Sequence, residues 1–91
     1  MKLKITYSGQ ARSTAGCANE VVELPAAATL RELLAVIAAR HGERMTSLLN
    51  VKERGTPAVL VFVGEEQVTW DAPRPLNDGD EIMLVSPISG G

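Results

Sequence analysis

The chain is poor in the residue types that mark several common functions. Its 91 residues include one cysteine, Cys17, and one histidine, His41. A single cysteine forms neither an internal disulfide nor a cysteine-based metal cage, so we expect no metal site. Only three residues are aromatic and the formal net charge is −2. Both features argue against a surface that binds nucleic acid through base stacking or dense positive charge.

Long apolar runs are also missing. No run approaches the roughly 20 residues that a membrane-spanning helix needs. The first residues, MKLKITYSG, lack the apolar stretch of a secretory signal. Hydrophobic residues nevertheless make up 45% of the chain, which is too many for a disordered protein. We therefore expect one small cytoplasmic domain with a reduced thiol and no membrane partner.

Alternating polarity predicts several strands. Residues 2–7 alternate as a half-buried strand does, and residues 20–24 and 81–85 repeat the pattern. Residues 58–63 are apolar on both faces, which is typical of a central strand. Residues 67–70 predict one further short strand.

Small and polar residues predict the connections. Residues 8–19 read as a turn or loop that joins the first two strands in a hairpin, and residues 52–57, 64–66 and 71–75 read as further loops or turns. Residues 77–80, Asn-Asp-Gly-Asp, predict a tight turn in which Gly79 supplies a positive φ. Asp78 and Asp80 are therefore interpreted as turn residues rather than as metal ligands or an acid–base pair.

Residues 29–41 predict the main helix. Thr29 and Glu32 have the spacing of a capping box, and apolar residues then recur at helical intervals. Arg40 and His41 fall in the last turn, where positive charge suits the helix dipole. Gly42 is expected to end the helix as a left-handed cap. Residues 43–49 predict at most one further short helical turn.

The resulting order of elements predicts the fold. Two strands, a helix and then three returning strands correspond to an α+β fold of the ubiquitin-like β-grasp plan. We expect a mixed sheet of four to five strands packed on one main helix. There are no internal repeats.

Few residues are equipped for catalysis. His41 is interpreted as a cap or surface residue, and Cys17 as a structural or incidental thiol. The chain contains no glycine-rich phosphate loop, no zinc-ligand spacing and no nucleophile elbow. We therefore expect a protein that is not an enzyme by itself.

The C-terminal region resembles the small ubiquitin-like sulfur carriers of the MoaD and ThiS type. The resemblance rests on the stretch Pro-Leu-Asn-Asp-Gly-Asp-Glu-Ile at residues 75–82, a short apolar strand, Pro87 and the terminal pair Gly90-Gly91. Many members carry two prolines before the tail, whereas Ser86 stands at the first position here. Chain length and the segment 43–57 are more similar to the MoaD branch, and also to a related carrier that feeds cysteine synthesis.

The resemblance implies a function for the tail. The carboxylate of Gly91 would be adenylated by a ubiquitin-activating-type enzyme that uses ATP, and a persulfide from a sulfurtransferase would convert it to a thiocarboxylate. Ile88, Ser89 and Gly90 would thread the partner's active site, where the absence of Cβ atoms lets a backbone approach closely. Residues 1–87 would form the domain and residues 88–91 a flexible tail, with no cofactor bound by the chain.

The resemblance also implies a docking surface on the last strand. Ile82 and Leu84 would face the core, and Met83 and Val85, followed by Pro87, would face the partner. The alternative is that both pairs are simply buried.

Four functions remain open from the sequence. The favoured one is a carrier that supplies sulfur for molybdopterin to the large subunit of molybdopterin synthase. The others are a sulfur carrier for cysteine, thiamine or tRNA thiolation, a protein modifier joined to lysines, and an interaction module with an incidental Gly-Gly end.

Overall fold

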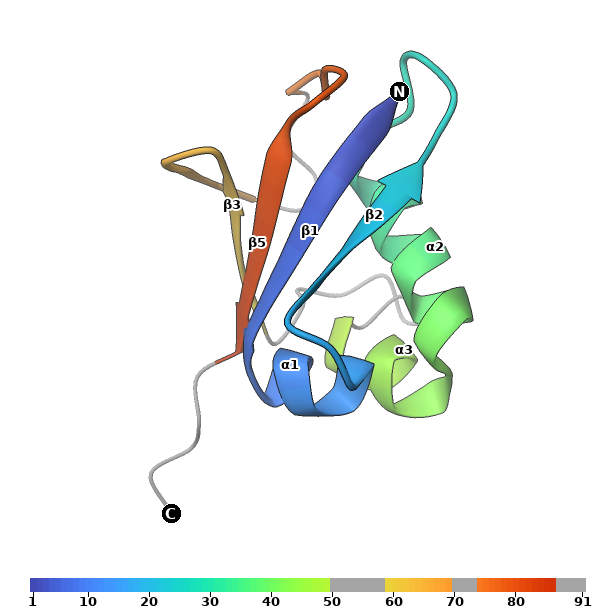
Figure 1. Ribbon diagram of the computed structural model, residues 1–91, viewed down its shortest axis with the longest axis vertical. Coiled ribbons are helices and arrows are strands. Elements are labelled where there is room, and N and C mark those ends of the chain that lie inside the picture. The colour runs from blue at the N-terminus through green and yellow to red at the C-terminus, as the bar shows by residue number, and fades with distance from the viewer. Residues whose placement is uncertain (50–58, 70–73, 87–91) are drawn as a thin grey trace.

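The computed structural model describes residues 1–49, 59–69 and 74–86 of the chain. Their helices and strands follow one another as β1 (Lys2–Gly9), α1 (Gln10–Ala15), β2 (Asn19–Glu23), α2 (Leu30–His41), α3 (Glu43–Leu49), β3 (Leu60–Val63), β4 (Glu66–Val68) and β5 (Glu81–Ser86). The strands form one sheet, and the helices cover one of its faces (Figure 1). The fold is therefore α+β, as the sequence predicts.

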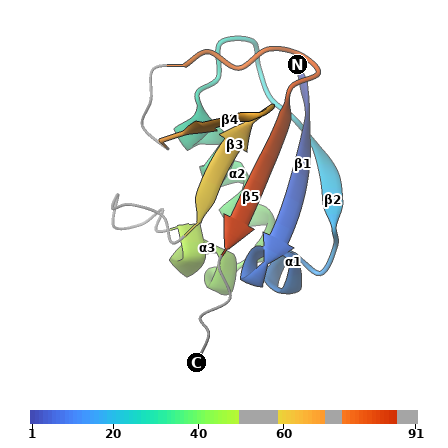
Figure 2. The ribbon, with the colours of Figure 1, turned by 90° about the vertical axis from the view of Figure 1, so that its left-hand side faces the viewer.

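The sheet is mixed and has the strand order β2-β1-β5-β3-β4. β1 and β5 run parallel in its centre, and the other neighbouring pairs are antiparallel. Figure 2 shows β5 between β1 and β3, with α1 and α3 near its C-terminal end. The last strand is thus held on both sides by earlier parts of the chain. This arrangement is the predicted β-grasp plan.

The core lies between the sheet and α2. Leu3 and Ile5 of β1 and Ile82 and Leu84 of β5 are fully buried, because alternate residues of a strand face the same side. The buried side of α2 consists of Leu30, Leu33, Leu34, Ile37 and Ala38. Each fully buried large apolar side chain contributes about 1.5–3 kcal/mol. The strands and the helix therefore stabilise one another through a shared apolar layer.

Both ends of α2 have specific hydrogen bonds. The Thr29 hydroxyl accepts a bond from the backbone N–H of Glu32 at 3.1 Å, which confirms the predicted N-terminal cap. The prediction of a left-handed cap at Gly42 is wrong, because its φ of 90° is combined with an extended ψ of −166°. Gly42 instead redirects the chain into α3, and its carbonyl accepts bonds from the backbone N–H and the hydroxyl of Thr46.

α1 replaces part of the predicted loop between the first two strands. β1 and β2 are antiparallel neighbours, as expected, but residues 10–15 of their connection are helical. The sequence does not predict α1 because six residues are too few to show a periodic pattern, and only Ala11 among them is buried. Gly16, in the left-handed conformation, ends the helix by donating its N–H to the carbonyl of Arg12.

Several elements begin or end at other residues than the sequence predicts. α3 spans seven residues rather than a single turn, and β5 extends through Ser86. Glu66 belongs to β4 rather than to the preceding turn. The loops predicted at residues 52–57 and 71–73, and the strand end at Trp70, lie outside the described residues.

Candidate functional site

β5 presents two chemically similar but differently placed sets of side chains. Ile82 and Leu84 are fully buried against the helices, whereas Met83 is 40% exposed and Val85 is partly exposed. The alternative in which both pairs are simply buried is therefore wrong for Met83. β5 thus offers apolar side chains on the sheet face that the helices leave open.

The neighbouring strand β3 extends this surface. Leu60 pairs with Val85 and Phe62 with Met83 across the antiparallel ladder, so that all four side chains lie on the same sheet face. Leu60 is 43% exposed and Phe62 is partly exposed. We call Leu60, Phe62, Met83 and Val85 the outer apolar patch. Contiguous exposed apolar side chains of this kind often mark a protein interaction site.

The C-terminal end of β5 is held tightly against the end of β1. Gly9 pairs with Ser86, and a Cβ at Gly9 would lie only 1.8 Å from the Ser86 carbonyl oxygen. Ser86 itself is buried, and its hydroxyl donates a bond of 3.5 Å to the side-chain oxygen of Gln10 on α1. Ser86 stands where many members of the family have the first of two prolines. In this chain it is therefore part of the folded domain. It fixes the point from which residues 87–91 continue.

The turn before β5 fixes the opposite end of that strand. The Asp78 carboxylate accepts a bond of 2.6 Å from the backbone N–H of Lys2, and Gly79 donates its N–H to the Lys2 carbonyl at 2.7 Å. The Asp80 carboxylate accepts from the N–H of Asn77, and Gly79 has a φ of 86°. These bonds confirm the interpretation of Asp78, Gly79 and Asp80 as turn residues.

A polar cluster that the sequence does not predict lies between β2 and the end of α2. Its centre is Glu20, whose carboxylate accepts bonds of 2.6 Å from the Tyr7 hydroxyl and from Arg40. His41 contacts the same carboxylate through Nε2, and Cys17 lies 4.0 Å away. Glu20 and His41 are mostly buried. His41 is therefore an internal partner rather than a simple helix cap.

Burial and hydrogen bonding shift two pKa values in this cluster. Burial, together with the bond to Glu20, raises the pKa of Tyr7 far above its ordinary value, so the phenol stays neutral. Burial alone would raise the pKa of Glu20, but the bonds from Tyr7, Arg40 and His41 outweigh it and lower that pKa. The carboxylate is thus held ionised to join β1, β2 and α2.

Glu20→Gln is expected to destabilise the fold by about 2 kcal/mol at neutral pH, because hydrogen bonds to a charged group are lost. A carboxyl with a lowered folded-state pKa stabilises the fold above its unfolded pKa, and this contribution disappears as pH falls through the folded value. The difference between the two proteins should therefore narrow in acid. Urea unfolding across that pH range measures it.

The control for this prediction is Glu23→Gln on the same strand. Glu23 forms an exposed ion pair of 3.8 Å with Lys2, which should contribute less than about 1 kcal/mol. Equal losses in the two variants would contradict a special role for the Glu20 cluster.

The remaining predicted site residues lie outside the described residues. These are Pro87, Ile88, Ser89, Gly90 and Gly91. Within residues 1–49, 59–69 and 74–86, no group of three or more His, Cys, Asp or Glu side chains is placed to hold a metal ion. No helix in that part of the chain is long and apolar enough to cross a membrane.

The sequence does not predict two parts of the site. The sequence places Leu60 and Phe62 in a central strand, but only the strand order shows that they flank Val85 and Met83. The Glu20 cluster joins residues far apart in the chain, and isolated polar residues give no periodic signal. The interpretation of His41 as a cap or surface residue is therefore wrong, because its side chain is mostly buried against Glu20.

Comparison with known proteins agrees with this architecture. The chain is 30% identical over all 91 residues to a protein of Chlamydomonas reinhardtii named molybdopterin synthase sulfur carrier subunit, and each chain is covered completely. Among solved structures, a putative molybdopterin converting factor subunit 1 from Pyrococcus furiosus is 30% identical, with a TM-score of 0.71 over 97% of this chain and 99% of that one.

More distant structures share the fold. SAMP1 from Haloferax volcanii matches over the whole of both chains with a TM-score of 0.82 and 18% identity. The complex of subunits 1 and 2 of the molybdopterin-converting factor from Helicobacter pylori contains a chain that matches with a TM-score of 0.56 and 19% identity, both chains being covered in full. A family profile, that of the ThiS family, matches residues 5–91. The chain therefore belongs to the ThiS family.

Proposed function

We propose that this protein is a sulfur carrier that donates sulfur for molybdopterin synthesis. The observation that carries the proposal is the 30% identity, over the full length of both chains, to a molybdopterin synthase sulfur carrier subunit. The family match also extends to residue 91, where the Gly-Gly end lies. In this proposal residues 1–87 form the domain and residues 88–91 form the tail that carries the sulfur.

The first step is activation of the Gly91 carboxylate. A carboxylate is stabilised by resonance and resists nucleophiles, so a ubiquitin-activating-type partner would join it to AMP and release pyrophosphate from ATP. The acyl-adenylate has a good leaving group. The ATP belongs to the partner, and this chain needs no cofactor of its own for the step.

The second step is loading with sulfur. The outer sulfur of a persulfide on a sulfurtransferase attacks the acyl carbon and displaces AMP, which gives an acyl disulfide. A second thiol then attacks the sulfurtransferase sulfur of this bond, forms a disulfide with it and releases the thiocarboxylate on Gly91. The sulfur is nucleophilic and tethered, so an accepting enzyme receives it without release of free sulfide.

The domain supplies binding and position rather than catalytic groups. The outer apolar patch gives partners an apolar contact beside the end of β5, and Ser86 is anchored by β1 and α1. A methionine at the centre of such a patch adapts to more than one partner in turn. The same surface thus suits the activating enzyme first and the large subunit of molybdopterin synthase afterwards.

Intact mass spectrometry tests the proposed function. Incubation with the activating enzyme from the same genome, ATP and a sulfurtransferase with its sulfur source should raise the mass by the difference between sulfur and oxygen. Omission of ATP is the control. An unchanged mass in the complete reaction, with an activating enzyme that loads its other substrates, would contradict the proposal.

The destination of the sulfur is tested with the loaded protein. Addition of the large subunit of molybdopterin synthase and its precursor should produce molybdopterin and return the tail to a carboxylate. Transfer instead to an enzyme of cysteine synthesis, thiamine synthesis or tRNA thiolation would indicate a different pathway. Lysine-linked adducts in cell extract would indicate a protein modifier.

Met83→Glu is expected to weaken binding of the large subunit by about tenfold, because a charge in the centre of an apolar interface must be desolvated. The free energy of unfolding should change by less than about 0.5 kcal/mol, since the side chain is 40% exposed. Calorimetric titration and urea unfolding measure the two quantities.

Val21→Glu is the matched control for Met83→Glu. Val21 is 56% exposed on the same sheet face but lies on β2, two strands from β5. Its replacement should leave binding unchanged. Equal loss of binding in both variants would contradict the assignment of the outer apolar patch as the docking surface.

A further inference from the structure

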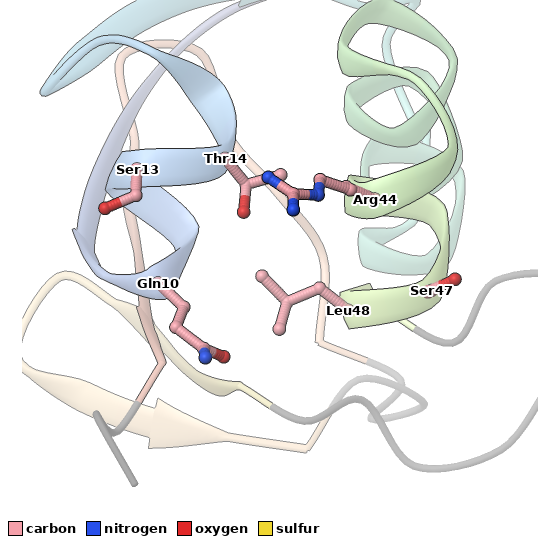
Figure 3. Close-up of a pocket in the computed structure, with 6 residues that line it drawn as sticks. All are labelled: Gln10, Ser13, Thr14, Arg44, Ser47 and Leu48. Carbon is pink, nitrogen blue, oxygen red and sulfur yellow. The ribbon is translucent and has the colours of Figure 1, made fainter.

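A pocket of about 510 Å³ lies between α1 and α3 (Figure 3). Its lining residues are Gln10, Ser13 and Thr14 from α1 and Arg44, Ser47 and Leu48 from α3. Arg44 extends from α3 toward Thr14, and Leu48 faces Gln10 beside them. The two serines lie at the margins. The described residues therefore give the pocket one guanidinium group, hydroxyl and amide groups and one apolar side chain.

The charge in this pocket is not compensated within the described part of the chain. Arg44 is exposed, and no acidic side chain among residues 1–49, 59–69 and 74–86 forms an ion pair with it. None of the described residues that line the pocket is acidic, although the chain as a whole has a net charge of −2. A guanidinium beside neutral hydrogen-bonding groups suits a carboxylate, which it can bind through two parallel bonds.

The position of the pocket connects it with the proposed docking surface. Gln10 lines the pocket and also accepts the hydrogen bond from Ser86, the last residue of β5. The outer apolar patch reaches the same end of β5 through Val85, on the opposite face of the sheet. Figure 2 shows the end of β5 close to α1 and α3. A partner that surrounds the residues after Ser86 therefore contacts both the patch and the pocket.

We propose that the pocket between α1 and α3 receives an acidic side chain, Asp or Glu, of the large subunit that accepts the sulfur. The carboxylate pairs with Arg44 and accepts hydrogen bonds from Thr14 and Gln10, while Leu48 packs against its methylene groups. The inference rests on the proposed function, because it requires that partner. Its consequence is a second point of attachment that orients the domain relative to the tail.

Arg44→Gln is expected to weaken binding of the large subunit by about tenfold, and Arg44→Glu by more, because it places two carboxylates together. Calorimetric titration with the large subunit from the same genome measures both variants. Neither should change the melting temperature, since the side chain is exposed and has no acidic partner in the described residues. Weakened binding should be restored when one Asp or Glu of the large subunit is replaced by Arg in combination with Arg44→Glu.

Arg12→Gln is the matched control, because it removes the same charge from an exposed position on α1 that does not line the pocket. Unchanged binding in Arg44→Gln, or equal loss in Arg12→Gln, would overturn the proposal. A defect confined to adenylation, with normal binding of the large subunit, would also overturn it and assign the pocket to the activating enzyme.

Inorganic phosphate is the probe for a free anion. Saturable shifts of the Arg44 side-chain NMR signal with phosphate, with unchanged large-subunit binding in the variants, would overturn the proposal in favour of a small-anion site. If the wild-type protein does not bind the large subunit at all, the proposed function fails, and this inference fails with it. If the wild-type protein binds the large subunit and the Arg44 variants bind it equally well, only the pocket proposal is overturned and the proposed function stands.

Discussion

Gly90→Val is expected to reduce loading of the C-terminus with sulfur by about a hundredfold or more. In the proposed mechanism the backbone of residues 90 and 91 passes close to the nucleotide, and a β-branched side chain both fills that space and restricts φ and ψ. Displacement of a reacting group by about 1 Å can cost a hundredfold in rate. The initial rate of pyrophosphate release from ATP, measured with the activating enzyme, is the direct readout of the activation step.

The size of the side chain provides a graded control. Gly90→Ala should lose less activity than Gly90→Val, and Gly91→Ala should be severely impaired because it alters the reacting residue itself. All three variants should keep the wild-type melting temperature and the wild-type affinity of the outer apolar patch for partners. Normal pyrophosphate release in a folded Gly90→Val protein would contradict the proposed role of the tail.

Gly9→Ala is expected to destabilise the fold by about 3 kcal/mol or more. Gly9 has a φ of 69° and a ψ of −139°, a combination that residues with a Cβ rarely adopt. The added methyl group would also lie 1.8 Å from the carbonyl oxygen of Ser86, and it is attached directly to the backbone of the paired strand, so neither group can move away by itself. The central β1–β5 pair must therefore separate locally. Urea unfolding at neutral pH measures the loss.

Gly16→Ala separates the two contributions to this effect. Gly16 also has a positive φ, of 75°, but no atom of the described residues lies within 4 Å of a Cβ at this position. Only the cost of the left-handed conformation remains, about 1 kcal/mol. Similar losses in both variants would contradict the importance of the close contact between β1 and β5. If Gly9→Ala does not fold, its absence from the soluble fraction next to folded Gly16→Ala gives the same answer.

Gly9 also connects stability with the proposed function. The Gly9–Ser86 pair fixes the end of β5, and the hydrogen bond from Ser86 to Gln10 joins that end to α1. In the proposed function, a partner that binds the patch therefore meets the end of β5 at a defined position. Partial separation of β1 and β5 should consequently reduce loading in any Gly9→Ala protein that remains folded.

Local patterns predicted those elements that are long or chemically distinctive. α2 combines a cap at Thr29 with apolar residues at helical spacing over twelve positions, and β1 alternates over most of its length. The turn at residues 77–80 was predicted because its aspartates and Gly79 satisfy a local backbone geometry. The family was also predicted from the sequence, through the stretch 75–82 and the Gly-Gly end.

Short elements and contacts between distant residues were not predictable in this way. α1 contains six residues with one buried position, so its helical state depends on the glycines at its two ends and on packing against β1 and β5. The predicted division of β5 is confirmed, since Ile82 and Leu84 are buried whereas Met83 is exposed and Val85 partly exposed. The docking role of Met83 and Val85 stays a prediction. The strand register decides which β3 residues complete the patch, since it pairs Leu60 with Val85 and Phe62 with Met83.

The sequence by itself determined the fold class, the main helix, the turn before the last strand and the family, because each depends on neighbours along the chain. Only the tertiary structure decided which residues surround the end of β5, since the sheet order brings β1 and β3 beside it. It likewise decided that Glu20 joins Tyr7, Arg40 and His41, and that Arg44 faces α1 across a pocket. Side chains distant in the sequence meet only after the apolar layer has fixed the positions of the strands and helices.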